Sequence, residues 1–381
     1  MSDTKRKLIF LVTEDWYFWS HRLPMARAAQ QAGFDVVVAT RVTAHGDRIA
    51  AAGFRLLPMR WRREEIGLFA SLGAIIEIYR LYRRERPFMV HHVAHKAAIL
   101  GAVAALLARV PRMVSFIAGV GYMGTSRSRH AQLVGAAARL LWAVLLLRRH
   151  CRVIVQNDDD RAVIEALRPG AADRIVVIRG SGVDLDHFQP LPEPPEPPVT
   201  AAFVGRMIAI KGVATLVEAQ RLLHADGIAL QLLLAGTPDL ANPSSFDEAT
   251  LRDWSNRPGV VWYGHSEDVR EVWASAHIAA LASNGGEGVP KTLLEAAAVG
   301  RAIVATDVPG NRDIARNGVN AILVPPGDAR ALADALKSLA SDPAKRRIYA
   351  VAGRKLAAEG FSEEAVSAAT VALYHELSAA V

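Results

Sequence analysis

Short apolar runs rich in Val, Ile and Leu alternate along the chain with longer segments of helical periodicity. The longer segments, for example 22–33 and 329–341, place apolar residues three and four positions apart. Continuous apolar strands that alternate with helices are typical of doubly wound parallel sheets covered on both faces, so we expect an α/β fold. The expected strands are 7–12, 35–39, 88–93, 112–117, 152–156 and 174–178, then 201–205, 230–236, 260–264, 278–282, 302–306 and 321–325.

A proline-rich stretch at 189–199 separates the two groups of strands. Six of its residues are proline, which cannot continue a helix or pair within a central strand. A length of 381 residues also suits two domains better than one core. We therefore expect a Rossmann-like N-terminal domain at 1–188, a stiff linker at 189–199 and a Rossmann-like C-terminal domain at 200–361. Ligands of this fold class bind at the carboxyl ends of the strands.

The most hydrophobic segment, residues 133–149, has two interpretations. It contains Arg139 and is shorter than the roughly 20 apolar residues that cross a bilayer. Its all-round hydrophobicity favours a core helix of the N-terminal domain. The alternative is a helix that rests partly on a membrane, with Arg148 and Arg149 toward the lipid headgroups.

Charge differs between the two halves. Residues 1–188 hold 28 Lys and Arg against 16 Asp and Glu, whereas the remainder holds 17 against 22. A basic N-terminal half suggests an anionic partner: membrane phospholipid, a phosphate-bearing acceptor or nucleic acid. Nucleic acid is the least favoured, and we exclude it as a partner, because no helix-turn-helix pattern, zinc module or RNA-binding signature occurs. The lone Cys151 cannot form an internal disulfide, which favours the cytoplasm.

The strongest candidate for chemistry is "GGEGVPKTLLEAAAVG", residues 285–300. Pro290 suits the first position of a helix and Gly300 its end, so Glu287 lies on the preceding loop and Glu295 inside the helix. The glycine loop can bring backbone close to a ligand, and a helix amino end offers unpaired N–H groups to a diphosphate. One carboxylate can accept hydrogen bonds from hexose hydroxyls, and the other can bind the two hydroxyls of a ribose.

A second element, "FVGRMIAIKG" at 203–212, predicts a strand, a glycine turn and a helix that opens at Gly212. Arg206 and Lys211 lie near that turn. Two fixed cations beside a diphosphate would stabilise the charge that grows on a departing nucleotide. The alternative is two surface cations on a loop. The loop around Glu287 favours the functional interpretation.

Together these motifs resemble the retaining glycosyltransferases of family 4, which have the GT-B fold of two Rossmann-like domains facing a central cleft. The resemblance is strongest over 204–212, 263–314 and 321–336, which follow the family order and spacing. It implies that the cation pair contacts the donor diphosphate, Glu287 the sugar and Glu295 the ribose. The implied catalytic residues are Glu287, Arg206 and Lys211, and the implied donor-binding residues are Gly205, Arg206, Lys211, Gly264, Gly286, Glu287, Gly288, Val289, Pro290 and Glu295.

Within this family, the opening "SHRLPMARAA" at 20–29 resembles enzymes that extend lipid-linked oligosaccharides. The resemblance implies transfer of a hexose or N-acetylhexosamine, with retention, from a nucleoside-diphosphate sugar, expected to be a UDP-sugar, to a polyprenyl-diphosphate-linked glycan. It implies no metal and no cofactor, and a phosphate oxygen of the leaving group takes the acceptor proton. The stretch 360–366 resembles the start of a final helix, 362–381, that packs back on the acceptor-binding N-terminal domain. Such an enzyme would be cytoplasmic, and its expected partners include an anionic membrane surface at the cytoplasmic face of the inner membrane.

The chain departs from the family pattern at three places, two of them in the N-terminal half. The usual Gly-Gly loop after the first strand is replaced by 13–22, the strand at 114–121 lacks the usual histidine, and Asp313 stands in place of a glutamate. Trp16 to Trp19 are either core residues or acceptor contacts at the end of the first strand. The acceptor-side candidates are His21, His95, Gly119 and Gly121.

Three other patterns carry weaker chemistry. The stretch 119–124 matches a dinucleotide-binding fingerprint, but no acidic residue occurs between Glu85 and Asp158, and that fingerprint needs one about 20 residues on. Asp158 to Asp160 follow a strand, where helix capping is favoured over a metal site. His91 and His92 point to opposite faces of their strand, so they do not form a metal site.

Two other functions compete with transfer. A nucleotide-sugar epimerase on the same scaffold would need a side-chain acid or base at the sugar and no acceptor. A nucleotide-sugar binding protein without turnover would need neither. The glutamate and cation pairs argue against the second, and the basic, aromatic-rich N-terminal half argues against the first.

Overall fold

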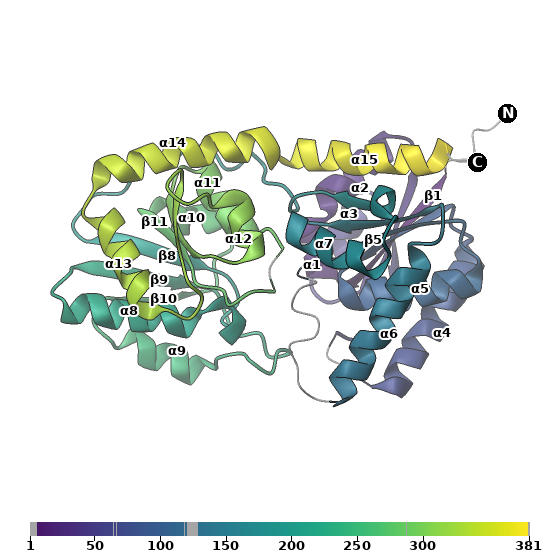
Figure 1. The fold of residues 1–381 in the computed structure, drawn as a ribbon, viewed down its shortest axis with the longest axis horizontal. Coiled ribbons are helices and arrows are strands. Elements are labelled where there is room, and N and C mark those ends of the chain that lie inside the picture. The colour runs from purple at the N-terminus through teal and green to yellow at the C-terminus, as the bar shows by residue number, and fades with distance from the viewer. Residues whose placement is uncertain are drawn as a thin grey trace. The chain divides into compact units, whose positions relative to one another are not determined.

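The computed structural model describes residues 6–63, 65, 67–117, 119, 129–286 and 288–379. It divides into a first unit, Met1–Ser181 with Glu363–Val381, and a second unit, Gly182–Ser362. Each unit is built around one parallel sheet with helices on both faces (Figure 1). The expected pair of Rossmann-like units is confirmed.

The first unit contains a seven-stranded sheet in the order β3-β2-β1-β4-β5-β6-β7. All its neighbouring strands are parallel. The edge strand β3 was not expected, because it has only four residues, neither of its ends is buried, and it lacks a continuous apolar run. The strands are β1 Lys7–Glu14, β2 Asp35–Arg41, β3 Arg55–Pro58, β4 Met89–Val93, β5 Arg112–Phe116, β6 Cys151–Val155 and β7 Ile175–Val177.

Helices cover both faces of this sheet because successive strand residues point to opposite sides. Ile9 and Leu11 belong to the core beneath α4, α5, α6 and α7, whereas Leu8 and Phe10 belong to the core beneath α1, α2, α3 and α15. Helix α15 lies along α2 (Figure 1). The helices are α1 Asp15–His21, α2 Leu23–Gln31, α3 Gly46–Ala51, α4 Leu68–Glu85, α5 His95–Ala108, α6 Arg129–Leu145, α7 Asp158–Leu167 and α15 Glu363–Ala379.

The hydrophobic segment 133–149 contains most of α6, which ends at Leu145. Trp142 and Leu145 are buried, but Leu140 is 67% exposed and Leu147, beyond the helix, is 52% exposed. The segment therefore contributes to the core and also leaves apolar side chains at the surface. In the part of the chain that the structure describes, no helix is long and apolar enough to cross a membrane.

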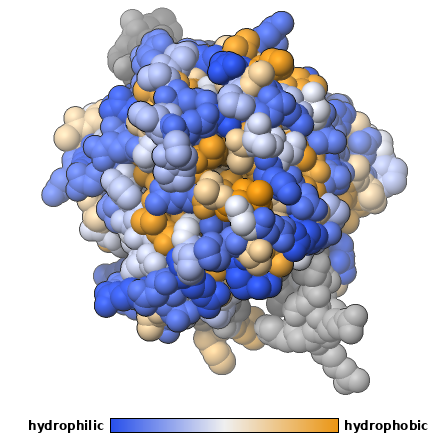
Figure 2. All heavy atoms as spheres, turned by 90° about the vertical axis from the view of Figure 1, so that its left-hand side faces the viewer, coloured by the Kyte–Doolittle hydropathy of each residue, from blue (hydrophilic) through white to orange (hydrophobic). Residues whose placement is uncertain are grey.

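The second unit contains a six-stranded parallel sheet in the order β10-β9-β8-β11-β12-β13. All six strands lie where the apolar runs predicted them. Figure 2 shows one face of this unit, where hydrophobic side chains gather near the middle and hydrophilic ones surround them. The strands are β8 Val199–Val204, β9 Leu230–Ala235, β10 Val260–Gly264, β11 Ile278–Leu281, β12 Ala302–Thr306 and β13 Ala321–Val324. The helices are η3 Ala209–Lys211, α8 Val213–Ala225, α9 Glu248–Ser255, α10 Val269–Ala274, α11 Lys291–Ala298, α12 Pro309–Ile314, α13 Ala329–Ala340 and α14 Pro343–Gly360.

The proline-rich stretch 189–199 lies within the second unit. Arg301, which is buried, donates hydrogen bonds to the carbonyl oxygens of Leu191 and Pro192, both at 2.8 Å. Arg346, also buried, pairs with Glu193 at 3.0 Å and Glu196 at 2.7 Å. The stretch is therefore bound to the body of this unit rather than standing off as a separate spacer.

Candidate active site

A small cavity lies where three adjacent strands of the second unit end. Its volume is about 220 Å³. The sheet order β10-β9-β8 places the carboxyl ends of these strands side by side, and this edge is where ligands of the fold class bind. The lining residues are Val204, Gly205, Arg206, Ala235, Gly236, Thr237, His265, Ser266 and Val269.

Backbone groups of glycines join the three strand ends. The amide of Gly205 donates to the carbonyl of Ala235 at 2.9 Å, and the amide of Gly236 donates to the carbonyl of Gly264 at 2.7 Å. A Cβ at Gly236 would lie 1.8 Å from the carbonyl oxygen of Gly205. Only glycine fits there, so this part of the cavity presents backbone to a ligand.

Arg206 lines the cavity with its guanidinium held by an acidic partner. Its Nη1 lies 2.6 Å from Oδ2 of Asp239, and the Arg206 side chain is 43% exposed while that of Asp239 is 12% exposed. The amide of Asp239 in turn donates to the hydroxyl of Ser245 at 2.8 Å. A guanidinium carries five N–H donors in a fixed plane, so this ion pair orients the others. Sequence reasoning missed Asp239, whose only signal was its place in the loop after β9.

Lys211 ends the short helix η3, directly before Gly212. The φ of Gly212 is 72°, and a Cβ there would lie 1.8 Å from the carbonyl oxygen of Ala282. The amide of Asn284 also donates to the carbonyl of Ile210 at 2.8 Å. These contacts bring the loop that carries Arg206 and Lys211 against the segment that follows β11, as a shared site requires.

That segment leads through the glycine loop into α11. Gly285 and Gly286 have φ values of 115° and 71°, which side-chain-bearing residues rarely adopt. Glu287, the sugar-binding candidate, lies outside the described residues. Val289 and Pro290 are buried. The sequence predicted Pro290 at the first position of the helix, but α11 begins at Lys291 and Pro290 is its N-cap residue. Glu295 lies in the second turn of α11 with 8% of its surface exposed.

A buried polar network supports the strand ends behind this loop. The hydroxyl of Thr306 donates to the carbonyl of Ser283 at 2.5 Å, and the Asn311 amide nitrogen donates to the carbonyl of Thr306 at 2.9 Å. Asn311 is fully buried. Because a buried polar group costs free energy unless it is hydrogen-bonded, this network fixes the carboxyl ends of β11 and β12.

The acceptor-side candidates come from three neighbouring strands of the first unit. His21 ends the helix that follows β1, His95 begins the helix that follows β4, and Gly119 follows β5. The ring of His21 stacks on that of Tyr17 at 4.3 Å, and the amide of Gly119 donates to Oδ2 of Asp160 at 2.8 Å. The sheet therefore brings His21, His95 and Gly119 to one edge, whereas Gly121 lies outside the described residues.

Asp15, at the end of β1, organises the same edge and was not singled out from the sequence. Its carboxylate accepts hydrogen bonds from the amides of Thr43 and His45 at 2.6 and 2.8 Å. Burial alone would raise the pKa of Asp15, but the hydrogen bonds from Thr43 and His45 outweigh burial and lower it. The ionised carboxylate thus ties the loop after β2 to the start of α1.

Asn157 caps the helix after β6, as the position after a strand predicted, and the acidic residues Asp158 to Asp160 form its first turn. The side-chain oxygen of Asn157 accepts from the amide of Asp160 at 2.6 Å, and Asp158 pairs with Arg179 at 2.7 Å. His91 and His92 face opposite sides of the sheet, as expected: His91 meets Tyr374 of α15, and His92 meets the hydroxyl of Tyr82 at 3.1 Å.

Comparison with known proteins agrees with this geometry. Residues 198–342 match the model described as glycosyl transferases group 1, and residues 7–157 match glycosyl transferase 4-like. The capsular polysaccharide biosynthesis glycosyltransferase CapM of Staphylococcus aureus is 23% identical over 82% of each chain. The UDP-Gal:alpha-D-GlcNAc-diphosphoundecaprenol alpha-1,3-galactosyltransferase of Escherichia coli is 24% identical over 73% of this chain and 72% of its own. The structure of Anabaena HepE in complex with UDP covers 97% of this chain and all of its own, with a TM-score of 0.76 and 16% identity.

The two units therefore form a GT-B glycosyltransferase. The chain belongs to the family 4-like glycosyltransferases, with one family model on each unit.

Proposed function

We propose that the second unit binds a UDP-sugar and that the enzyme transfers its hexose or N-acetylhexosamine with retention. The observation that carries the proposal is the joining of two loops: the one that bears Arg206 and Lys211 contacts the segment leading to the glycine loop and α11 through Ile210 and Gly212. A structural neighbour of the same fold binds UDP. A diphosphate would meet two cations and a helix amino end here, which together neutralise its charge.

The proposed reaction needs no metal ion or cofactor. As the bond between the anomeric carbon and the diphosphate oxygen breaks, negative charge grows on the diphosphate, and Arg206, Lys211 and the amino end of α11 stabilise it. The acceptor hydroxyl forms the new bond on the same face of the sugar, and its proton passes to an oxygen of the departing phosphate. Glu287 binds the sugar hydroxyls and Glu295 the ribose hydroxyls.

The acceptor is proposed to be a glycan on a polyprenyl diphosphate. The relative from Escherichia coli has a diphosphoundecaprenol-linked sugar in its name, and the charge of residues 1–188 suits phosphate-bearing lipid. His21, His95 and the loop around Gly119 and Gly121 would contact it. The enzyme would then act peripherally, on an anionic membrane surface at the cytoplasmic face of the inner membrane.

A donor panel tests the proposal. Uridine, guanosine and adenosine diphosphate sugars are compared by thermal shift, since a ligand at 100 times its Kd stabilises by about 2.7 kcal/mol. The best donor is then incubated with lipid-linked acceptor, with and without EDTA. Free nucleotide that appears only with acceptor, unaffected by EDTA, supports the proposal. An isomerised donor would show an epimerase instead, and binding without any product would show a binding protein.

A further inference from the structure

The first half of α4 exposes a row of large apolar side chains. Leu68 is 70% exposed, Phe69 88%, Leu72 46% and Ile76 49%. Leu68, Leu72 and Ile76 are spaced four apart, so they form one row on the helix surface, and Phe69 lies beside it. Scattered exposed apolar residues are ordinary, but a contiguous group on one helix marks an interaction surface.

Arginines continue this row and flank its start. Arg80 and Arg84 follow Ile76 at the same spacing of four, and both are exposed. Arg60 and Arg62, in the segment that leads to α4, are also exposed. Each step of four rotates the row by about 40° around the helix, so Leu68 and Arg84 lie about 160° apart. The helix therefore has an exposed apolar first half and exposed arginines in its second half, and exposed apolar and basic side chains on one element suit contact with an anionic bilayer surface.

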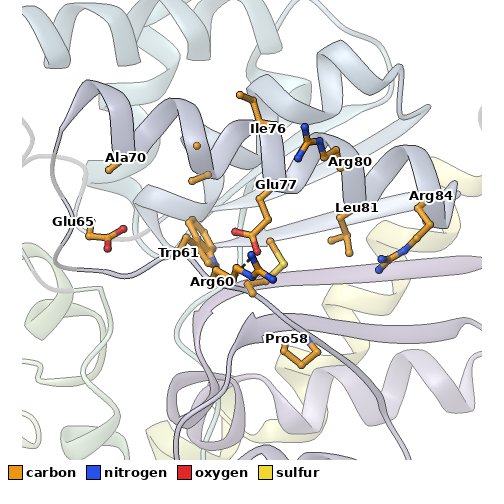
Figure 3. Close-up of a pocket in the computed structure, with 13 residues that line it drawn as sticks. Pro58, Arg60, Trp61, Glu65, Ala70, Ile76, Glu77, Arg80, Leu81 and Arg84 are labelled. Carbon is orange, nitrogen blue, oxygen red and sulfur yellow. Dashed lines mark hydrogen bonds between the residues drawn. The ribbon is translucent and has the colours of Figure 1, made fainter.

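A groove runs beneath this helix (Figure 3). Its volume is about 770 Å³, and its residues include Arg60, Arg80 and Arg84, with Trp61 and Leu81 as apolar lining. Two acidic residues, Glu65 and Glu77, also line it, and Glu77 accepts a hydrogen bond from the backbone amide of Arg60 at 2.8 Å. Three arginines against two glutamates leave the lining cationic, so it complements a phosphate headgroup.

The topology places the apolar half at the acceptor edge of the sheet. Helix α4 connects β3 to β4, which run parallel, so it runs back from the carboxyl edge to the amino edge. Its first turn therefore lies near the edge from which His21, His95 and Gly119 come. Lys96, in the first turn of α5, donates to the carbonyl of Glu65 at 2.8 Å and so joins the two segments.

We infer that α4 is the membrane-docking element of this protein: Leu68, Phe69, Leu72 and Ile76 enter the outer acyl region of an anionic leaflet while the arginines of the groove bind lipid phosphates. This inference rests on the proposed function for its purpose, since a lipid-linked acceptor would then reach the sheet edge without leaving the membrane. The surface itself is defined by exposure and charge alone. We infer anionic phospholipid as the ligand of this surface because arginines follow its apolar residues along the helix.

Insertion is measured with a dye at the most exposed position. The natural Cys151 is buried, and burial raises its pKa to about 11, so a Phe69→Cys variant is labelled selectively at position 69. On vesicles of phosphatidylglycerol and phosphatidylcholine the fluorophore emission should shift to shorter wavelength, and on pure phosphatidylcholine it should not. Several hundred millimolar salt should reverse the shift, because it reduces the Debye length to a few ångströms.

Paired variants locate the docking face by co-sedimentation. Phe69→Glu/Leu72→Glu should weaken partitioning onto the acidic vesicles about tenfold or more for each side chain, whereas Leu140→Glu/Val144→Glu, a matched change on exposed positions of α6, should not. Equal losses in both pairs, or binding without a spectral shift, would overturn the inference. A change in oligomeric mass with unchanged vesicle binding would assign the face to a second copy instead, and would equally overturn it.

The outcome is separable from that of the proposed function. Donor binding, measured by thermal shift in the absence of lipid, should be the same in both pairs and in the native chain. Failure of vesicle docking with intact donor binding counts against the α4 inference only. Docking without any glycosyl transfer counts against the proposed reaction only.

Discussion

The residues that pack at the carboxyl edges of the two sheets differ in kind. In the second unit, glycine backbones close the strand ends around a small cavity, and Arg206 is held beside it by Asp239. In the first unit, large side chains fill the edge: the Arg22 guanidinium lies 3.7 Å from the centre of the Phe116 ring, and both residues are buried. A site that binds with backbone demands glycine at fixed positions, whereas an edge closed by packing accepts many residue combinations.

The largest effect is expected when the positive charges at the carboxyl edge of the second unit's sheet are removed. Arg206→Ala and Lys211→Ala should each lower kcat about 10²- to 10³-fold, the scale expected when one group that stabilises developing charge is removed, with a smaller change in donor KM. Steady-state kinetics with saturating acceptor measure this. Arg252→Ala on α9 is the control, since that arginine also pairs with an acid at 2.7 Å but is 71% exposed. A loss confined to KM would show uniform binding instead.

A smaller loss is expected when Glu295, the proposed ribose-binding carboxylate, is replaced. Glu295→Ala should weaken UDP binding roughly ten- to 100-fold, because a hydrogen bond to a charged group contributes about 1.5–3 kcal/mol. Isothermal titration calorimetry measures the Kd, and Glu295→Gln keeps the side-chain shape as a comparison. An unchanged Kd in a folded Glu295→Ala protein would remove Glu295 from the site.

The importance of the close backbone contact at Gly212 is tested by comparing alanine variants of two glycines that have the same backbone conformation. Gly212 and Gly227 both have a φ of 72°, but a Cβ at Gly212 meets the Ala282 carbonyl while one at Gly227 meets nothing within 4 Å. Gly227→Ala should cost about 1–2 kcal/mol for the left-handed backbone alone, and Gly212→Ala about 1–3 kcal/mol more. Urea unfolding gives both values. Equal losses would mean that the close contact carries no cost.

The buried histidines of the first unit should make its stability depend on pH under acidic conditions. Burial lowers the pKa of His92 to about 3 from its ordinary 6.5, so between those values the unfolded chain binds a proton that the folded chain does not. Stability should therefore fall as the pH falls through this window, and His92 contributes at most about 1.4 kcal/mol per pH unit to that slope. The buried His91, whose pKa burial also lowers, adds to the slope in the same direction. His92→Gln should flatten the slope between pH 6.5 and 5, and His187→Gln, at an exposed position, should leave it. A slope unchanged in His92→Gln would assign it to other groups.

The sequence predicted the regular strands and the fixed motifs of the molecule. The six strands of the second unit and most of those of the first are continuous apolar runs, which sequence alone reveals. Strand β3 was not predicted because it is short and lies at the edge of the sheet. In the second unit, Arg206, Lys211 and the glycine loop of the proposed donor site form a motif with fixed spacing.

What the sequence could not reveal depends on contacts between distant residues. Asp239 lies 33 positions after Arg206, with no motif around it. On α4, the apolar residues at 68, 69, 72 and 76 match the pattern of a core helix. Only the exposure of each side chain shows that this row faces outward, while Ala74, Ile78 and Leu81 of the same helix face the core.

The proline-rich stretch has a consequence for dissecting the enzyme. Its composition suggests cutting the chain at residue 199 to obtain the second unit alone. Such a fragment would lose Glu193 and Glu196 and leave the buried Arg346 without its carboxylates, a change that typically costs about 3–5 kcal/mol. Beginning the fragment at Gly182 keeps both pairs, together with the carbonyl groups that Arg301 and Arg354 bind. A fragment that contains only the second unit should therefore begin before the prolines and not after them.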